Sequence, residues 1–130
     1  MKHYEVVAAI ILHQDKILCV QRGESKYSYV SRKYEFPGGK METGETKQEA
    51  IKREIEEELK MKIDVKSDFL TVHHNYPDFK LTMHSLMCEA KDSNLTLTEH
   101  IDFKWLSKKE LTSLDWAPAD IPIVEKLIGS

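Results

Sequence analysis

The chain has 130 residues, 41% of them hydrophobic, which predicts one folded domain over residues 1–130 and excludes wholesale disorder. Its net charge of -3 argues against a protein that coats nucleic acid, so no stable nucleic-acid partner is expected. No apolar run approaches the ~18 residues that cross a bilayer, and the first residues lack a signal-peptide pattern, so we expect a cytoplasmic protein without a membrane partner.

The first part of the chain predicts a hairpin, a polar loop and a short strand. Residues 4–12 are rich in β-branched and apolar side chains, and residues 16–21 alternate weakly, so they are expected to pair as two strands. Residues 22–33 are polar and contain glycine, serine and tyrosine, which is typical of a loop. A strand over 34–36 is then expected to stop at a turn over 37–39, Pro-Gly-Gly.

The clearest element is a helix over residues 47–60. Thr46 and Glu49 have the spacing of a capping box, in which the threonine hydroxyl accepts a helical amide and the glutamate reaches back. A last helix is expected to begin at residues 120–122, because a proline is favoured in the first turn. Further strands are predicted over residues 62–74, 80–89 and 102–106. This order indicates an α/β sandwich rather than a strictly alternating parallel fold.

Three glutamates gather on one side of the predicted helix. On a wheel of about 100° per residue, Glu58 lies about 40° to one side of Glu54, and Glu57 lies about 60° to the other. The adjoining apolar stripe consists of Ile51, Ile55 and Leu59. Carboxylates at the edge of the core repel one another, and hard divalent cations such as Mg²⁺ relieve that repulsion. From the helix alone, a solvated acidic face with Lys and Arg partners remains the alternative.

The segment before the helix completes a spaced pattern. Gly39 is followed after five residues by Glu45 and, after seven more, by Arg53-Glu54-Ile55-Glu56-Glu57-Glu58. This resembles the Nudix box: Gly, five residues, Glu, seven residues, Arg-Glu, an aliphatic residue, any residue, Glu-Glu, any residue, Gly and an aliphatic residue. The final glycine is replaced by Lys60. A helix often ends there at positive φ, so lysine is expected to cost about 1 kcal/mol of stability without touching the chemistry.

The resemblance covers nearly the whole chain, and residues 34–40 are similar to the lead-in of MutT-type members, which hydrolyse nucleoside triphosphates. It implies an α/β/α sandwich with a mixed β-sheet and a loop-helix-loop catalytic motif. It also implies dependence on Mg²⁺, with Mn²⁺ as a substitute. The metal ligands that it implies are the carbonyl of Gly38 and the side chains of Glu54, Glu57, Glu58 and Glu99.

The catalytic residues follow from the same resemblance. Arg53 and Glu45 are implied to form an ion pair that orients the catalytic helix. Glu99 stands six residues before Trp105, a spacing similar to that of the family's carboxylate on a later loop, although an ordinary loop glutamate is the alternative. The residue that takes the proton from the attacking water stays open among Glu54, Glu57 and Glu99.

The implied reaction is attack of water at the β-phosphorus of a nucleoside triphosphate, which releases pyrophosphate and a nucleoside monophosphate. Arg22 and Lys40 are candidates to bind the triphosphate, and each is otherwise a solvated surface cation. Nothing in the sequence predicts the oligomeric state, so either a monomer or a homodimer is expected.

The segment Ala117-Pro118-Ala119-Asp120-Ile121-Pro122 is similar to that of cytosine-nucleotide pyrophosphohydrolases in the family. An ionised Asp120 can only accept hydrogen bonds, which suits the N4 amine of cytosine and favours CTP, dCTP or a 5-modified dCTP. The alternative for Asp120 is a helix N-cap. Tyr4, Val6 and Phe36 are candidates for the apolar walls of the base pocket, or are plain core residues.

Two other functions remain open. A protonated aspartate can donate a hydrogen bond, so 8-oxo-dGTP is the second expected substrate. A non-catalytic nucleotide-binding module of the same fold is the third possibility, but such a protein is expected to have lost box carboxylates that this chain retains. ADP-sugars, dinucleoside polyphosphates and capped RNA are further substrates of the family.

Overall fold

The computed structural model describes residues 1–130. Its long strands are β1 (Lys2–His13), β5 (Ile63–Asn75) and β6 (Phe79–Ala90). Its short strands are β2 (Lys16–Gln21), β3 (Tyr34–Glu35), β4 (Gly38–Lys40) and β7 (Asp102–Leu106). The α-helices are α1 (Lys47–Leu59) and α2 (Ile121–Ile128), and two 3₁₀ turns are η1 (Lys108–Ser113) and η2 (Pro118–Asp120). The predicted order of strands, helix, strands and helix is confirmed.

The strands form one mixed sheet. β1 runs parallel to β6 from the pair Lys2 and Phe79 to the pair Leu12 and Glu89. β5 returns antiparallel to β6, and β2 pairs antiparallel with β1, β3 and β7. The parallel pairing of β1 with β6 therefore joins two antiparallel halves, and it brings the first strand next to residues that follow it by more than seventy positions.

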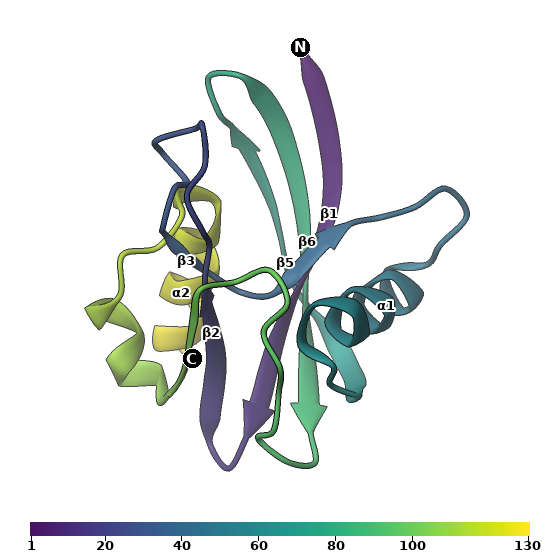
Figure 1. The fold of residues 1–130 in the computed structure, drawn as a ribbon, viewed down its shortest axis with the longest axis vertical. Coiled ribbons are helices and arrows are strands. Elements are labelled where there is room, and N and C mark those ends of the chain that lie inside the picture. Colours follow the sequence, from purple (N-terminus) through teal and green to yellow (C-terminus); the bar gives the residue numbers. More distant parts are fainter.

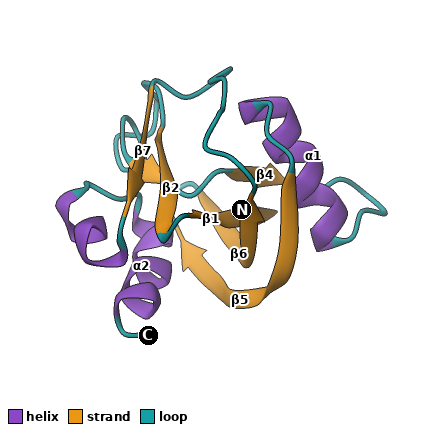
Figure 2. Cartoon of the chain, turned by 90° about the horizontal axis from the view of Figure 1, so that it is seen from below, coloured by secondary structure: helices purple, strands orange, loops and turns teal.

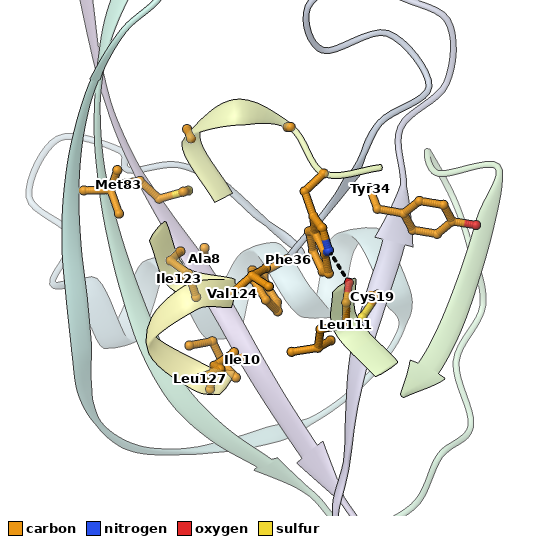
Figure 3. Close-up of a cluster of buried hydrophobic side chains, with 14 of the residues drawn as sticks. Ala8, Ile10, Cys19, Tyr34, Phe36, Met83, Leu111, Ile123, Val124 and Leu127 are labelled. Atoms are coloured by element: carbon orange, nitrogen blue, oxygen red, sulfur yellow. Dashed lines mark hydrogen bonds between the residues drawn. The ribbon is translucent and has the colours of Figure 1, made fainter. Parts of the chain in front are cut away.

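One helix covers each face of the sheet (Figures 1 and 2). Successive side chains of a strand point to opposite faces, so alternate residues of β1 enter two different cores. The core under α1 includes Val7, Ala9, Ile11, Ile51, Ile55 and Leu59. The core under α2 includes Ala8, Ile10, Phe36, Ile123 and Leu127 (Figure 3). The predicted α/β/α sandwich with a mixed sheet is confirmed.

Helix α1 begins with the predicted capping box. Thr46 Oγ1 accepts the Glu49 amide at 3.1 Å, and Glu49 Oε1 accepts the Thr46 amide at 2.9 Å. The helix ends at Leu59 because Lys60 adopts the left-handed conformation, with φ 54° and ψ 37°. The Lys60 amide still donates to the Glu56 carbonyl at 3.1 Å. Lysine therefore occupies a backbone position that favours glycine, as its place in the sequence pattern predicted.

We expect Lys60→Gly to raise the free energy of unfolding by about 1 kcal/mol, because glycine adopts the left-handed conformation without a Cβ clash. Urea unfolding followed by circular dichroism measures the change. The matched control is Lys62→Gly, since Lys62 lies in the same connection without positive φ and glycine there is expected to destabilise. Equal destabilisation by both substitutions would contradict the prediction.

The C-terminal segment packs on the opposite face from α1. Pro122 lies in the first turn of α2, as predicted, and Leu127 is fully buried one turn later. Trp116 Nε1 donates to the carbonyl of Leu111 at 2.7 Å, which ties η1 to the segment that leads into η2 (Figure 3). No helix of the chain is both long enough and apolar enough to span a membrane.

Candidate functional site

A cavity of about 620 Å³ lies between the sheet, the loop of residues 22–33 and η2, which is a volume typical of small-molecule sites. Its walls include these residues predicted from the sequence: Tyr4, Val6, Arg22, Phe36, Gly38, Lys40, Glu58, Glu99 and Asp120. The other predicted residues lie beside the cavity, on α1 or just before it: Glu45, Arg53, Glu54 and Glu57. The structure therefore brings segments from the whole chain to one place.

Arg53, in the middle of α1, is the centre of an ion-pair network. Its Nε and Nη2 donate to the two carboxylate oxygens of Glu45 at 2.6 and 2.8 Å, which confirms the predicted pair. Its Nη1 donates to Glu54 at 2.8 Å and to Glu57 at 3.3 Å. Its Nη2 also donates to the Lys40 carbonyl at 3.1 Å. The bidentate pair lowers the pKa of Glu45 to about 2, so the loop carboxylate stays charged and holds the guanidinium in place.

The three clustered glutamates of α1 have different surroundings. Glu58 is buried, whereas the Glu57 side chain is 60% exposed. Burial, followed by the charges of Glu54 and Glu99, raises the pKa of Glu58 to about 9. Burial also raises the pKa of Glu54, although Arg53 opposes the change. The negative charge of this group is therefore only partly balanced by Arg53, because each carboxylate disfavours the ionised form of its neighbours.

Glu99 reaches this group because its segment is fastened to the end of α1. The Thr98 amide and hydroxyl both donate to the Glu58 carbonyl, at 3.1 and 2.9 Å. The Thr96 amide donates to the Leu59 carbonyl at 2.9 Å. These bonds satisfy carbonyls that a helix end leaves without partners. The next residue, Glu99, is thereby held beside Glu58 at the cavity wall.

The donor set fits a hard divalent cation. Glu58 Oε2 is buried without a hydrogen-bond partner, and an orphaned carboxylate oxygen is a ready ligand for such an ion. No three acidic, histidine or cysteine side chains are grouped closely enough to hold one ion as they stand, so the carboxylates would have to turn toward a bound cation. Only oxygen donors are present in this group, which suits Mg²⁺ or Mn²⁺ better than a soft metal.

Gly38 and Gly39 form strand β4 rather than the predicted turn. They pair with Ala8 and Val7 of β1, and neither glycine has positive φ. A Cβ on Gly38 would lie 1.9 Å from the Val7 carbonyl oxygen, and one on Gly39 would lie 2.5 Å from Glu54 Oε2. The glycines are therefore required for close approach to β1 and to α1, not for turn flexibility, and this corrects the sequence-based expectation.

Glu35 connects two walls of the cavity. Its Oε1 accepts Arg22 Nη1 at 3.1 Å, and its Oε2 pairs with His100 Nε2 at 3.0 Å. The His100 side chain is only 4% exposed, and its Nδ1 is buried without a partner. Arg22 is therefore fixed at the cavity by an acidic partner rather than solvated freely, and the segment that carries Glu99 is tied to β3.

Asp120 is buried at the cavity wall, with 4% exposure. Its Oδ1 accepts the Phe36 amide at 3.0 Å, and the side chain makes no capping bond to α2. Asp120 therefore occupies the N-cap position of α2, but capping does not account for its buried carboxyl. Burial and the charge of Glu35 raise the pKa of Asp120 well above its usual range, so the neutral form is favoured over the ionised form considered from the sequence.

The remaining predicted wall residues are held by aromatic contacts. Lys40 Nζ lies 4.2 Å from the centre of the Tyr4 ring, and Phe36 stacks on Trp116 with ring centres 4.7 Å apart. Phe36 is both a core residue and a wall residue, and Val6 is half-buried against the same core.

The polar wall residues that were not predicted include Glu35, His100 and Tyr76. Glu35 directly precedes Phe36, and His100 directly follows Glu99. Their position next to predicted site residues could therefore have indicated them. Tyr76 gives no such signal, because the β5–β6 hairpin brings it to the cavity.

The sequence model of the NUDIX domain matches residues 6–126. The chain is 35% identical over 130 residues to the CTP pyrophosphohydrolase of Escherichia coli K12, covering 99% of this chain and 94% of that protein. It is 29% identical over 127 residues to the 8-oxo-dGTP diphosphatase of the same organism, covering 98% of both.

A solution NMR structure of the MutT protein, a Nudix hydrolase, from methicillin-resistant Staphylococcus aureus 252 is similar throughout. It is 42% identical in sequence, with a TM-score of 0.76, and the match covers 99% of this chain and 98% of that one. The NUDIX match spans most of the chain, and these full-length relatives agree with it. The chain therefore belongs to the Nudix hydrolase family, as a MutT-like enzyme that acts on acid anhydrides.

Proposed function

We propose that this Nudix enzyme hydrolyses a cytosine triphosphate (CTP, dCTP or a 5-modified dCTP) to the monophosphate and pyrophosphate, with Mg²⁺ as its cofactor. The observation that supports this most directly is one cavity that combines Glu58 and Glu99 with the buried carboxyl of Asp120. The carboxylates suit a cation bound to phosphates, and Asp120 suits a polar base edge. The relative named as a CTP pyrophosphohydrolase supports the same substrate.

The residues of the site have separate roles in the proposed reaction. Glu54, Glu57, Glu58, Glu99 and the Gly38 carbonyl would hold the cation. A bound divalent cation neutralises phosphate charge and lowers the pKa of a coordinated water. Arg22 and Lys40 bind the triphosphate from the cavity wall, while Arg53 fixes Glu54. A carboxylate of the cluster takes a proton from the attacking water while the oxygen of that water bonds to the β-phosphorus. The bond from the β-phosphorus to the α–β bridging oxygen breaks, and the bridging oxygen leaves with the nucleoside monophosphate.

Asp120 selects the base through its free oxygen. The Phe36 amide uses one lone pair of Oδ1, so Oδ2 and the second lone pair of Oδ1 are left for a substrate. A neutral carboxyl presents a donor and an acceptor side by side, and cytosine presents the N3 acceptor beside the N4 amine. An ionised carboxyl can only accept, so it binds N4 alone. The ionised form favours cytosine over thymine or uracil, which carry a carbonyl at that position. The neutral form does so when the base lies with its 3-position against Oδ2, because the Phe36 amide keeps the acceptor on Oδ1 and the proton on Oδ2.

The second candidate substrate is 8-oxo-dGTP. A neutral Asp120 also complements the N7–H donor and the O6 acceptor of the oxidised purine. The relative named as an 8-oxo-dGTP diphosphatase supports this candidate. The two substrates require the same phosphate chemistry and differ only in the base that Asp120 binds.

Asp120→Ala is expected to lower kcat/KM for dCTP about 100-fold, since it removes the buried group that pairs with the base. The kcat/KM for dTTP is expected to change much less. Pyrophosphate release is measured over the common NTPs and dNTPs, 5-methyl-dCTP and 8-oxo-dGTP. Asp115→Asn is the matched control, because Asp115 is exposed, pairs with Lys33 and does not line the cavity.

Asp120→Asn identifies the form of the carboxyl that binds the base. With the side-chain oxygen held by the Phe36 amide, the amide nitrogen of the introduced asparagine replaces Oδ2 and can only donate. Retained cytosine preference therefore indicates a neutral Asp120, and lost preference indicates an ionised one. A wild-type preference for 8-oxo-dGTP over dCTP would replace the first substrate by the second. An equal loss on every substrate in Asp120→Ala would contradict base reading.

A further inference from the structure

Tyr76 is a buried tyrosine at the start of the turn between β5 and β6. Its amide donates to the Phe79 carbonyl at 2.9 Å, and the residue is 5% exposed. Its ring stacks on Tyr29 with centres 4.8 Å apart and meets Phe79 at 5.1 Å and His74 at 4.4 Å. The ring is therefore held on several sides, and the position of the hydroxyl is fixed by the packing.

The Tyr76 hydroxyl has a proton without a partner in the protein. Its oxygen accepts the Ala119 amide at 3.0 Å, and no residue of the chain accepts the hydroxyl proton. A phenol has one donor as well as acceptor capacity, and a buried donor left unpaired costs about 1–3 kcal/mol. Tyr76, Ala119 and Asp120 all line the cavity. The unpaired donor therefore lies where a bound molecule can supply the acceptor.

We propose that the Tyr76 hydroxyl donates a hydrogen bond to the 2-carbonyl oxygen of the cytosine base, next to the edge that Asp120 pairs with. This assignment rests on the proposed function. Ala119, which holds the hydroxyl, directly precedes Asp120, so the phenol and the carboxyl lie at the same part of the wall. Cytosine carries N4, N3 and O2 in sequence along one edge. The atom beyond those paired with Asp120 is therefore an acceptor, which is what the hydroxyl requires.

The surroundings keep the hydroxyl in its donor form. Burial raises the pKa of Tyr76 to about 12, so the proton is retained throughout the neutral range. Tyr76 and Asp120 then have separate roles. Asp120 distinguishes the amine of cytosine from the carbonyl of uracil or thymine, and Tyr76 strengthens binding of a pyrimidine through an atom that all three bases share.

The test compares Tyr76→Phe with wild type on dCTP and on 2-thio-dCTP, in which a weakly accepting sulfur replaces O2. In wild type, kcat/KM is expected to be about tenfold lower for the thio substrate, which corresponds to one hydrogen bond. In Tyr76→Phe, kcat/KM for dCTP is expected to fall about tenfold through KM, and the sulfur should make no further difference. Tyr29→Phe is the matched control, because its hydroxyl bonds to Asp78 at 2.7 Å in the same aromatic cluster but outside the cavity.

Each other outcome contradicts the assignment in a recognisable way. An equal loss on both substrates in Tyr76→Phe would show that the hydroxyl acts only by holding Ala119. An unchanged kcat/KM would show that it has no role. If the variant does not fold, equal wild-type rates on dCTP and 2-thio-dCTP are sufficient to overturn the proposal. If wild type prefers dCTP and Tyr76→Phe has the same kcat/KM as wild type, the proposed function stands and the role of Tyr76 is overturned. If wild type does not hydrolyse dCTP, the proposed function and the role of Tyr76 are both overturned.

Discussion

Glu54→Gln is expected to lower kcat for triphosphate hydrolysis about 1000-fold, because it removes a charged oxygen from the group proposed to bind the cation and to accept the proton. Glu54 is held by Arg53 at 2.8 Å and lies against Gly39. Glutamine has the same shape and can still accept from Arg53. The melting temperature is therefore expected to change by less than about 4 °C.

The matched control for Glu54 is Glu56→Gln on the same helix. Glu56 is exposed, has no ion pair and does not line the catalytic cavity, so its replacement is expected to leave kcat unchanged. Steady-state kinetics at saturating Mg²⁺ and dCTP measure both variants, and differential scanning calorimetry monitors folding. Similar rates for Glu54→Gln and Glu56→Gln would remove Glu54 from the proposed site.

Alanine at the two glycines of β4 is expected to affect stability and activity to different extents. In Gly38→Ala, the new Cβ meets the Val7 backbone, which cannot move without breaking the pairing of β4 with β1. We expect a loss of about 3 kcal/mol or more in the free energy of unfolding. In Gly39→Ala, the Cβ meets the end of the Glu54 side chain, which can rotate away. Stability then falls by about 1 kcal/mol, but kcat/KM falls about 100-fold because the carboxylate is displaced.

Gly23→Ala is the control for both glycine variants. A Cβ at Gly23 would make an ordinary contact of 3.6 Å with Ile101, so neither stability nor activity is expected to change much. Urea unfolding and dCTP kinetics are measured on all three proteins. Full activity in a folded Gly39→Ala variant would show that close approach of β4 to Glu54 is not needed for the reaction.

The features that were predicted from the sequence depend on residues that lie close together along the chain. The capping box of Thr46 and Glu49 and the pair of Arg53 with Glu45 depend on fixed spacings along a few turns of chain, and both are present. The left-handed Lys60 follows from its position at the end of the same helix. Runs of apolar and β-branched residues similarly predict the strands, because such side chains suit a buried pleated sheet.

The features that could not be predicted depend on contacts between distant segments. The glycines of β4 look like a turn in the sequence, but their close contacts are with Val7 and Glu54. The burial of Asp120 depends on the Phe36 amide, which precedes it by more than eighty residues. The position of Tyr76 depends on how the β5–β6 hairpin packs against η2. Such positions follow from the folded sheet and not from any periodicity in the chain.

The measurement that tests the central claim most directly is hydrolysis of dCTP by the wild-type enzyme in ¹⁸O-labelled water, with and without Mg²⁺, followed by mass spectrometry of the products. We predict Mg²⁺-dependent formation of dCMP and pyrophosphate, with one labelled oxygen in the pyrophosphate, because water attacks the β-phosphorus. Formation of dCDP and phosphate, label in dCMP instead of pyrophosphate, or the absence of any hydrolysis of dCTP would contradict the account.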